Sequence, residues 1–299
     1  MTVGRPHEGA GASAAPPADW LRDPAYLQAE QYRSDQNLAA RMALHARFST
    51  SPIDWYAWQF QHMAPLVPCG GHLLEVGCGP AAFWAFNLAD VPPDWSITLT
   101  DLSSGMIAAG QQRLGDAAQR FVWKQAAADA LPFADASVDV VLAHHMLYHV
   151  PDLPATLREF QRVLRPGGVL LAATNGSAHM AEIQQLVTHA RVVTGGDVAA
   201  DVSASASPTT REVFAAAFGL ENGAEHLAQV FRDVSLELFP DALRVTDPEA
   251  LLAFVRSMPD AADLSSDAAA AICATVAQAI QQHGAFHVSK AGGMFRAYR

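Results

Sequence analysis

The chain has 299 residues, of which 51% are hydrophobic. It can therefore bury a sizeable core, and its length fits one large α/β domain with additions or two small domains. Asp and Glu outnumber Lys and Arg, 30 against 19, and the formal net charge is -11. Such a surface would repel a phosphate backbone, which disfavours nucleic acid as a partner. The three cysteines form neither a CxxC pair nor a zinc spacing, as is typical of thiols in a reducing compartment.

The N-terminal region divides into two parts. Residues 1–19 are rich in Gly, Ala and Pro without apolar periodicity, so we expect a disordered tail. In residues 20–65, apolar and aromatic positions recur mostly at helical separations, which predicts a helical N-terminal cap. The chain has no signal-like N-terminus and no apolar segment long enough to cross a bilayer, so we expect a cytoplasmic protein without membrane insertion.

The centre of the chain, residues 66–177, carries regularly spaced apolar runs. They are HLLEV at 72–76, SITLTD at 96–101, VDVVLA at 138–143 and GVLLAAT at 168–174. Helix-length stretches separate them, as in parallel strands joined by right-handed crossovers. The pattern predicts a doubly wound α/β sheet.

The remainder of the chain has a weaker pattern. Residues 178–230 are predicted to form a helical insertion, or substrate lid, before the sixth strand. Residues 231–299 are predicted to be the C-terminal part of the core sheet, with strands at 234–239 and 294–298 and helices at 247–257 and 266–282. The segment 198–210 has loop composition, and it is a candidate mobile connection.

Residues that could bind a ligand or take part in catalysis lie where the predicted strands end. After the first run, Gly77 and Gly79 allow a tight turn and a close approach of the backbone to a ligand. A plain strand-to-helix turn is an equal alternative for two glycines alone. Asp101 ends the second run, where a carboxylate can accept both hydroxyls of a ribose. Its alternative role is a helix N-cap, although Ser103 and Ser104 could also cap.

Two further motifs support a nucleotide site. Asp129-Ala-Leu-Pro-Phe133 places an acidic and a small residue where the loop after the third strand would meet an adenine. Leu164-Arg-Pro-Gly-Gly168 is a helix stop that leads directly into a buried strand.

Together, LLEVGCGP, LTDLSSGM, DALPF, VDVVLAHHMLYHV and LRPGG occur in an order that resembles class I S-adenosylmethionine-dependent methyltransferases, especially the small-molecule type of ubiquinone and menaquinone biosynthesis. The resemblance implies a Rossmann-like sheet of seven strands with an antiparallel last strand. It also implies S-adenosyl-L-methionine as cofactor and S-adenosyl-L-homocysteine as product. The family often has a third glycine two residues past Gly79, where this chain has Ala81.

The same resemblance implies roles for individual residues. Glu75, Gly77, Cys78 and Gly79 would line the methionine end of the cofactor, and Asp101 would hold its ribose. Leu102 and Met106 would flank the adenine, Asp129 and Ala130 would contact its edge, and His144 would contact the cofactor mainly through its backbone.

The segment before the core resembles the N-terminal caps that close over the cofactor in small-molecule methyltransferases. On this interpretation Arg41 pairs with the cofactor carboxylate, while Tyr32, Trp55 and Trp58 contact the substrate. The alternative is an amphipathic helical segment packed on the sheet with its tryptophans inside.

Four polar aromatic residues follow the run at 138–143: His144, His145, Tyr148 and His149. His145 and His149 would share a helix face, which raises the question of a metal site, but no acidic or cysteine ligand lies within the cluster and Val150-Pro-Asp152 indicates a turn. We therefore predict no metal. His145 is the candidate general base, and Tyr148 and His145 are candidate substrate contacts. A structural polar residue at a strand end is an equal alternative for His145.

The sequence thus predicts methyl transfer by in-line displacement to a small, partly apolar metabolite of secondary or quinone-like metabolism. Two alternatives stay open. An NAD-dependent oxidoreductase would share the glycine turn and the acidic residue, but not DALPF and LRPGG together. A relative could also bind the cofactor and cyclise its substrate without methyl transfer.

Overall fold

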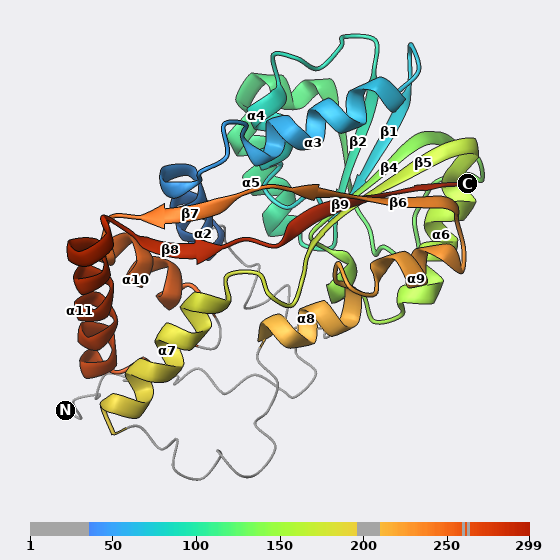
Figure 1. Cartoon of the computed structure of the whole chain (residues 1–299). Helices are drawn as coiled ribbons and strands as arrows, with labels where there is room; N and C mark the ends of the chain where they lie inside the picture. The colour runs from blue at the N-terminus through green and yellow to red at the C-terminus, as the bar shows by residue number, and fades with distance from the viewer. Residues whose placement is uncertain (1–35, 196–209, 259–260, 262–263) are drawn as a thin grey trace, which may run out of the picture.

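The computed structural model describes residues 36–195, 210–258, 261 and 264–299. Seven strands form the main sheet in the order β3-β2-β1-β4-β5-β9-β6 (Figure 1). They are β1 (His72–Val76), β2 (Ser96–Asp101), β3 (Phe121–Gln125), β4 (Val138–His144), β5 (Leu164–Asn175), β6 (Arg232–Phe239) and β9 (Gly292–Tyr298). The first five are parallel, and β9 runs antiparallel between β5 and β6. The predicted seven-stranded sheet with an antiparallel last strand is confirmed.

Helices cover both faces of this sheet, as its doubly apolar parallel strands require. One face is covered by α3 (Trp55–Met63), α4 (Ala82–Asn87) and α5 (Ser104–Leu114), around a core that contains Trp84 and Leu142. The other is covered by α6 (Leu153–Val163), α8 (Thr210–Phe218) and α9 (Gly223–Ala228), around Phe160 and Phe295. Three short 3-10 helices complete this part: η3 (Ala64–Leu66), η4 (Gly115–Arg120) and η5 (Leu147–His149).

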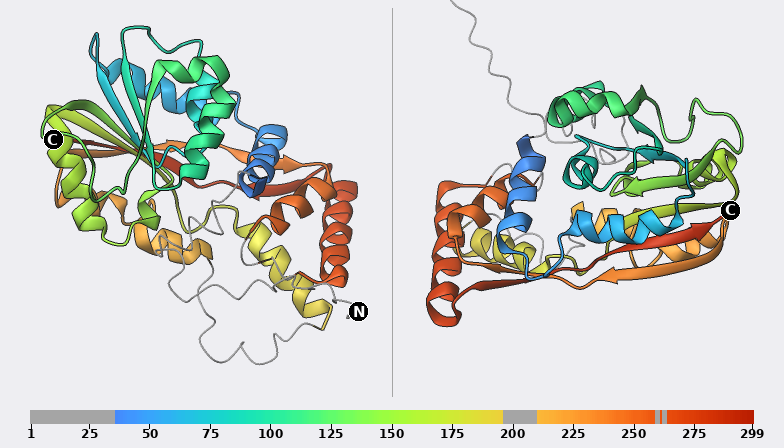
Figure 2. Two further views of the ribbon diagram at one scale, coloured as in Figure 1. Left: turned by 180° about the vertical axis from the view of Figure 1, so that it is seen from behind. Right: turned by 90° about the horizontal axis from the view of Figure 1, so that it is seen from above.

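A second group of elements, which we call the lobe, lies beside the main sheet (Figures 1 and 2). It comprises α2 (Gln36–Phe48), β7 (Ala242–Val245), α7 (Ala181–Val193), α10 (Pro248–Arg256), α11 (Ser266–His283) and β8 (Phe286–Ser289). Its own hydrophobic core contains Leu44, Leu251 and Ile272. β7 and β8 form a separate antiparallel pair, and they extend the β6–β9 pair beyond the main sheet (Figure 2).

The sequence pattern predicted only part of the lobe. The helices expected at 247–257 and 266–282 are present as α10 and α11. The segment 231–299, however, belongs only partly to the core sheet, because its middle forms β7, β8 and these two helices. The expected tail at 1–19, part of the helical cap and nearly all of the loop at 198–210 lie outside the described residues. No helix in the described part of the chain is both long and apolar enough to span a membrane.

Candidate cofactor and acceptor site

The turn after β1 is built on left-handed backbone. Gly77 has φ 69°, Gly79 has φ 52° and Ala81 has φ 52°, a region that favours glycine. A Cβ added at Gly77 would lie 2.8 Å from the Cβ of Met146, whereas nothing lies within 4 Å of a Cβ added at Gly79. Gly77 is therefore needed for packing against the end of β4, and Gly79 borders open space. Ala81 adopts, at a cost in strain, the conformation for which the family often uses glycine.

Asp101 joins the glycine turn to β2. Its Oδ2 accepts a hydrogen bond from the Gly79 N–H and its Oδ1 accepts one from the Ser103 N–H, both at 2.8 Å. Burial raises the pKa of Asp101, while these backbone donors act in the opposite direction. Because a carboxylate has about four lone-pair sites, the side chain retains acceptor capacity beside Gly79.

Cys78 lies inside the same turn. Its N–H donates to the Thr100 carbonyl at 2.9 Å, which ties the turn a second time to β2. Burial raises the pKa of the Cys78 thiol well above its ordinary value, so the sulfur stays protonated and does not act as a nucleophile.

Glu75 is buried beneath the turn and makes two side-chain contacts. Its Oε2 accepts from Trp84 Nε1 at 2.5 Å, and its Oε1 lies 3.1 Å from His144 Nδ1. With an ionised Glu75, Nδ1 of His144 carries the proton, so Nε2 of a neutral ring is an acceptor. That Nε2 is buried and has no hydrogen-bond partner among the described residues. The pair therefore presents one unmatched acceptor at the end of β4.

The predicted adenine contacts lie along the ends of β2 and β3. Met106 is buried at the start of α5, and Gln125 donates to the Leu102 carbonyl at 2.8 Å. Asp129 and Ala130 occupy an exposed turn after β3. The chain leaving β3 is attached to β2, because the Ala126 N–H donates to the Asp101 carbonyl at 3.1 Å. The structure thus groups these segments at one edge of the sheet.

Arg41 is engaged elsewhere in this structure. Its Nη2 donates to the Ser257 carbonyl at 2.5 Å and its Nε to the Ser257 hydroxyl at 3.3 Å. Ser257 is the C-cap of α10, where a cation is favourable. These bonds give Arg41 a role in joining α2 to α10, and its pairing with a cofactor carboxylate stays a prediction. Tyr32 lies outside the described residues.

The predicted substrate contacts separate into two places. The rings of Trp55 and Trp58 stack at 5.2 Å, and Trp55 lies 5.8 Å from the His145 ring. Trp58 itself is buried in the core, as the packing alternative predicted. Tyr148 instead packs against Phe214 of α8 at 4.4 Å. The structure brings Trp55 and His145 together and places Tyr148 with another helix.

His145 is the first residue after β4 and has a left-handed backbone, φ 55°. This conformation is costly for a non-glycine residue and is frequent at functional sites. Its N–H donates to the Ala173 carbonyl of β5 at 2.9 Å. Burial, with smaller effects of His144 and Lys290, lowers the pKa of His145 to about 4, so the imidazole is neutral at pH 7.

Two further histidines lie near His145, and we call His45, His145 and His179 the histidine cluster. The rings of His45 and His179 are 6.3 Å apart. Burial lowers the pKa of His45 to about 3 and that of His179 well below its ordinary value, with Lys290 and His145 acting in the same direction on both. Sequence reasoning did not single out His179 or Lys290, because each is an isolated residue with no motif around it.

Lys290 is paired with Asp241 in an ion pair that is almost completely buried. Asp241 follows β6 and Lys290 precedes β9, so the pair marks the joint between the main sheet and the lobe. Oδ1 of Asp241 also accepts from the N–H groups of Thr50 and Ser51, each at 3.0 Å. The connection between α2 and α3 is thereby attached to the same joint.

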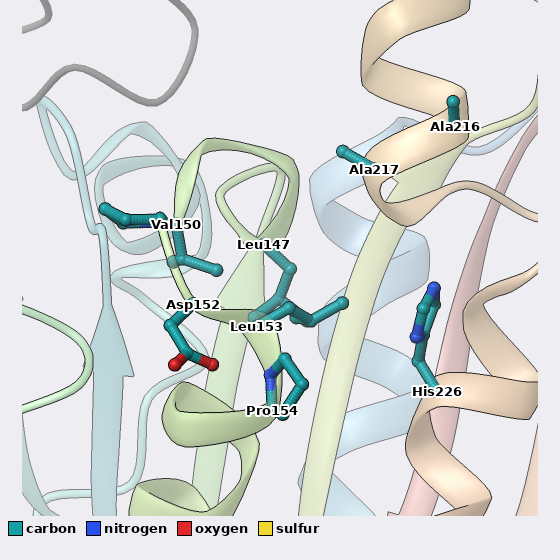
Figure 3. Close-up of a pocket in the computed structure, with 9 residues that line it drawn as sticks. Leu147, Val150, Asp152, Leu153, Pro154, Ala216, Ala217 and His226 are labelled. Carbon is teal, nitrogen blue, oxygen red and sulfur yellow. The ribbon is translucent and has the colours of Figure 1, made fainter. Parts of the chain in front are cut away.

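A separate hollow of about 320 Å³ lies between η5, α6, α8 and α9 (Figure 3). The side chains of Leu147 and Leu153 border it on one side, and His226 borders it on the other (Figure 3). None of the residues implied to bind the cofactor lines it. Within the described ranges, no group of three or more His, Cys, Asp or Glu residues is arranged to hold a metal ion.

Comparison with known proteins identifies the central segment. Residues 74–172 match the family model described as a methyltransferase domain. These residues form a class I methyltransferase domain. The chain is 35% identical over 130 residues to a ubiquinone/menaquinone biosynthesis C-methyltransferase of Paracoccus denitrificans, a match that covers 43% of this chain and 48% of the relative. The chain thus spans about half the length of the curated relatives it matches.

Solved structures agree on the fold of this methyltransferase domain. Phosphoethanolamine N-methyltransferase 2 of Haemonchus contortus, in complex with S-adenosyl-L-methionine, superposes with a TM-score of 0.54 at 18% identity, over 93% of this chain and 60% of that one. The [4+2]-cyclase SpnF superposes with a TM-score of 0.51 at 16% identity, over 97% of this chain and 99% of that one.

Proposed function

We propose that this protein transfers the methyl group of S-adenosylmethionine to a small, partly apolar acceptor. The observation that carries the proposal is the open space beside Gly79, next to a carboxylate with remaining acceptor capacity. This is the arrangement that a nucleoside needs at the carboxyl edge of a doubly wound sheet. The matched methyltransferase domain supports the same cofactor.

The described residues fit the chemistry of this cofactor. Asp101 would accept the ribose hydroxyls, and the segment of Leu102, Asp129 and Ala130 would border the adenine. The unmatched Nε2 of His144 would accept a hydrogen bond from the ammonium of the methionine part, while Glu75 holds the ring through Nδ1.

The cofactor supplies an activated methyl group on a sulfonium. The protein has to align the acceptor with it and exclude water. Trp55 would form the apolar wall of the acceptor site, with the buried Trp58 stacked behind it. His145 would take a proton when the acceptor is a hydroxyl or an acidic carbon, because its ring is neutral at pH 7. The acceptor would bind between the end of β4 and the lobe.

The proposal is tested with the whole chain. Calorimetry should detect binding of S-adenosylmethionine and no binding of NAD. A screen of small hydroxylated and aromatic metabolites should release S-adenosylhomocysteine, and mass spectrometry should detect an acceptor that has gained one methyl group. Binding of NAD alone would favour an oxidoreductase. An acceptor that isomerises without gaining mass would favour a cyclase.

A variant tests the base. Replacing His145 with Ala should lower kcat on the order of 10²-fold for a hydroxyl acceptor and leave the affinity for S-adenosylhomocysteine nearly unchanged. The kcat profile of the native protein should rise with pH near the lowered pKa of about 4, and the variant should lack that rise. An unchanged kcat and profile would remove His145 from the mechanism.

A further inference from the structure

We propose that two copies of this chain associate through β6, whose free edge pairs antiparallel with β6 of the second copy about a two-fold axis at Leu236. The inference goes beyond the proposed function and does not depend on it, because no residue assigned to the cofactor or the acceptor takes part. Its evidence is an open sheet edge, an exposed apolar row along that edge, and a charge pattern that favours one register.

β6 is one of the two edge strands of the main sheet. It pairs with β9 on one side, and no strand in the described part of the chain pairs with its other side. The right-hand view of Figure 2 shows β6 along the outer margin of the molecule. Further along the ribbon, the edge of β7 is covered by the chain that follows α2. Ser49 forms a β-bridge to Leu243, and the next residue, Thr50, donates its N–H to the Ala242 carbonyl at 2.9 Å. The open part of this edge is therefore β6 itself.

The sequence of β6 lacks the usual protection of an exposed edge. Free edges present unpaired N–H and C=O groups, and natural proteins often block further pairing there with Lys, Pro or a short strand. β6 has eight residues, RDVSLELF, without Lys or Pro. The opposite edge strand, β3, has five residues and includes Lys124. Of the two edges of the main sheet, β6 is thus the one suited to pair with another chain.

Two large apolar side chains of β6 are exposed to solvent. Leu236 is 37% exposed and Leu238 is 62% exposed. Leu238 pairs with Gly293 of β9, which has no side chain for the leucine to pack against. Leu236 pairs with Phe295 and so points to the same face, where Val234 packs against the core that contains Phe295. An apolar row therefore continues from the core to the free edge, and a second apolar row could bury it.

The regular part of β6 is short and clearly bounded. A bulge interrupts its pairing with β9 between Arg232 and Ser235, where Asp233 has φ 49°. Pro240 follows the strand and cannot donate to a ladder. Residues 234–239 are left for continuous pairing. Because side chains alternate between faces and opposite residues share a face, a two-fold axis has to pass at a residue and not between two residues.

Three of the possible centres are unfavourable. An axis at Glu237 would place two Glu237 carboxylates directly opposite each other, which is destabilising. An axis at Ser235 would place Glu237 opposite Asp233 and would bring the bulge into the ladder. An axis at Leu238 would bring Pro240 into the ladder, where a hydrogen bond would be lost.

An axis at Leu236 matches both faces of the strand. On one face, Leu236 of one copy lies opposite Leu236 of the other, and Val234 lies opposite Leu238. These side chains form one apolar row across the axis, and pairing removes both leucines from water. On the other face, Ser235 lies opposite Glu237, whose carboxylate can accept a hydrogen bond from the serine hydroxyl. Residues 234–238 of the two copies therefore pair without like charges opposite each other.

The mass of the full chain in solution tests the association. Pairing of residues 234–238 is a small interface, so we expect a reversible dimer with a dissociation constant on the order of 10 µM. Sedimentation velocity from about 1 to about 200 µM should show the change from monomer to dimer. Leu238→Lys should weaken association on the order of 10-fold or more, because an ammonium would meet the apolar row.

A matched substitution on the other edge is the control. Val122 is 53% exposed on β3, so Val122→Lys places the same charge on a similarly exposed edge position. It should leave the dissociation constant unchanged, and circular dichroism should show that both variants are folded.

Cysteine cross-linking tests the register. The background carries Cys69→Ser and Cys273→Ser, and diamide accepts the two hydrogen atoms as each disulfide forms. Leu236→Cys should cross-link with itself, because directly opposite Cα atoms are about 4.5–5.5 Å apart, within the range of a disulfide. Ser235→Cys should not cross-link with itself, because diagonal neighbours are about 7–8 Å apart. A mixture of Ser235→Cys and Glu237→Cys chains should cross-link.

The outcomes that overturn the proposal are specific. A monomer at every concentration overturns it, whether the edge is free or is covered by another segment of the same chain. A dimer that persists unchanged in Leu238→Lys and does not cross-link through Leu236→Cys also overturns it, because association then uses another surface. Cross-linking of Glu237→Cys with itself, without cross-linking of Leu236→Cys, rejects the register.

Discussion

The two glycines of the turn after β1 should respond differently to the same substitution. Both have positive φ, so alanine at either position costs roughly 1–2 kcal/mol of strain, less about 0.4–1 kcal/mol gained by restricting the unfolded chain. At Gly77 the new Cβ also meets the Met146 Cβ at 2.8 Å, which adds about 1–3 kcal/mol of overpacking. We therefore expect Gly77→Ala to lower the free energy of unfolding by about 2–4 kcal/mol and Gly79→Ala by about 1 kcal/mol.

The second half of this prediction concerns the ligand. A Cβ at Gly79 enters open space, where the proposed cofactor would lie. We therefore expect Gly79→Ala to reduce the free energy of S-adenosylhomocysteine binding by more than it reduces the free energy of unfolding. Urea unfolding followed by circular dichroism gives the stabilities, and calorimetry gives the affinities. Equal losses of stability in the two variants would refute the packing argument for Gly77. An unchanged affinity in Gly79→Ala would place the cofactor elsewhere.

Three other predictions follow from buried polar groups. Asp101→Asn turns an amide N–H toward a backbone N–H, so urea titration should show a loss of about 1–3 kcal/mol; native stability would contradict the observed hydrogen bonds. The three histidines of the cluster have lower pKa values in the folded protein than the ordinary value of 6.5 that they have in the unfolded chain. Their contribution to the free energy of unfolding is therefore present above pH 6.5 and is lost as the pH falls toward the pKa values of the folded protein. Stability should drop by up to about 1.4 kcal/mol per pH unit for each histidine, and a flat profile from about pH 7 to 5 would exclude this. Trp84→Phe removes a donor from buried Glu75 and should cost about 1–3 kcal/mol, clearly more than the control Trp95→Phe in the same unfolding assay.

Four of the five parallel strands could be predicted closely because each is an apolar run bounded by polar turns, whereas β3 (FVWKQ) is mostly exposed and was not predicted. β1 and β2 have the predicted limits, His72–Val76 and Ser96–Asp101. The roles of the residues after them were less accessible. The partner of Glu75 is Trp84 on the next helix, and no local pattern indicates that pairing.

The lobe strands β7 and β8 and the histidine cluster could not be predicted, because the strands are short and the residues of the cluster are scattered along the chain. β7 and β8 have four residues each, too few to show a clear alternation. His45, His179 and Lys290 are distant in the chain, and each sits in an ordinary helix or loop sequence. They meet only because the β6–β9 pair continues into the lobe, which is a consequence of tertiary packing and not of local propensity.

The pairing of Phe239 with Gly292 means that the chain leaves the main sheet and returns to it at neighbouring positions. Residues 240–291 are in this sense a cassette, and a two-residue turn would be enough to join the antiparallel strands without it. Relatives with different cassettes could share one cofactor domain and act on different molecules. An exchange of this segment between such proteins would have to preserve the apolar faces of α2 and α7, whose side chains share its hydrophobic core.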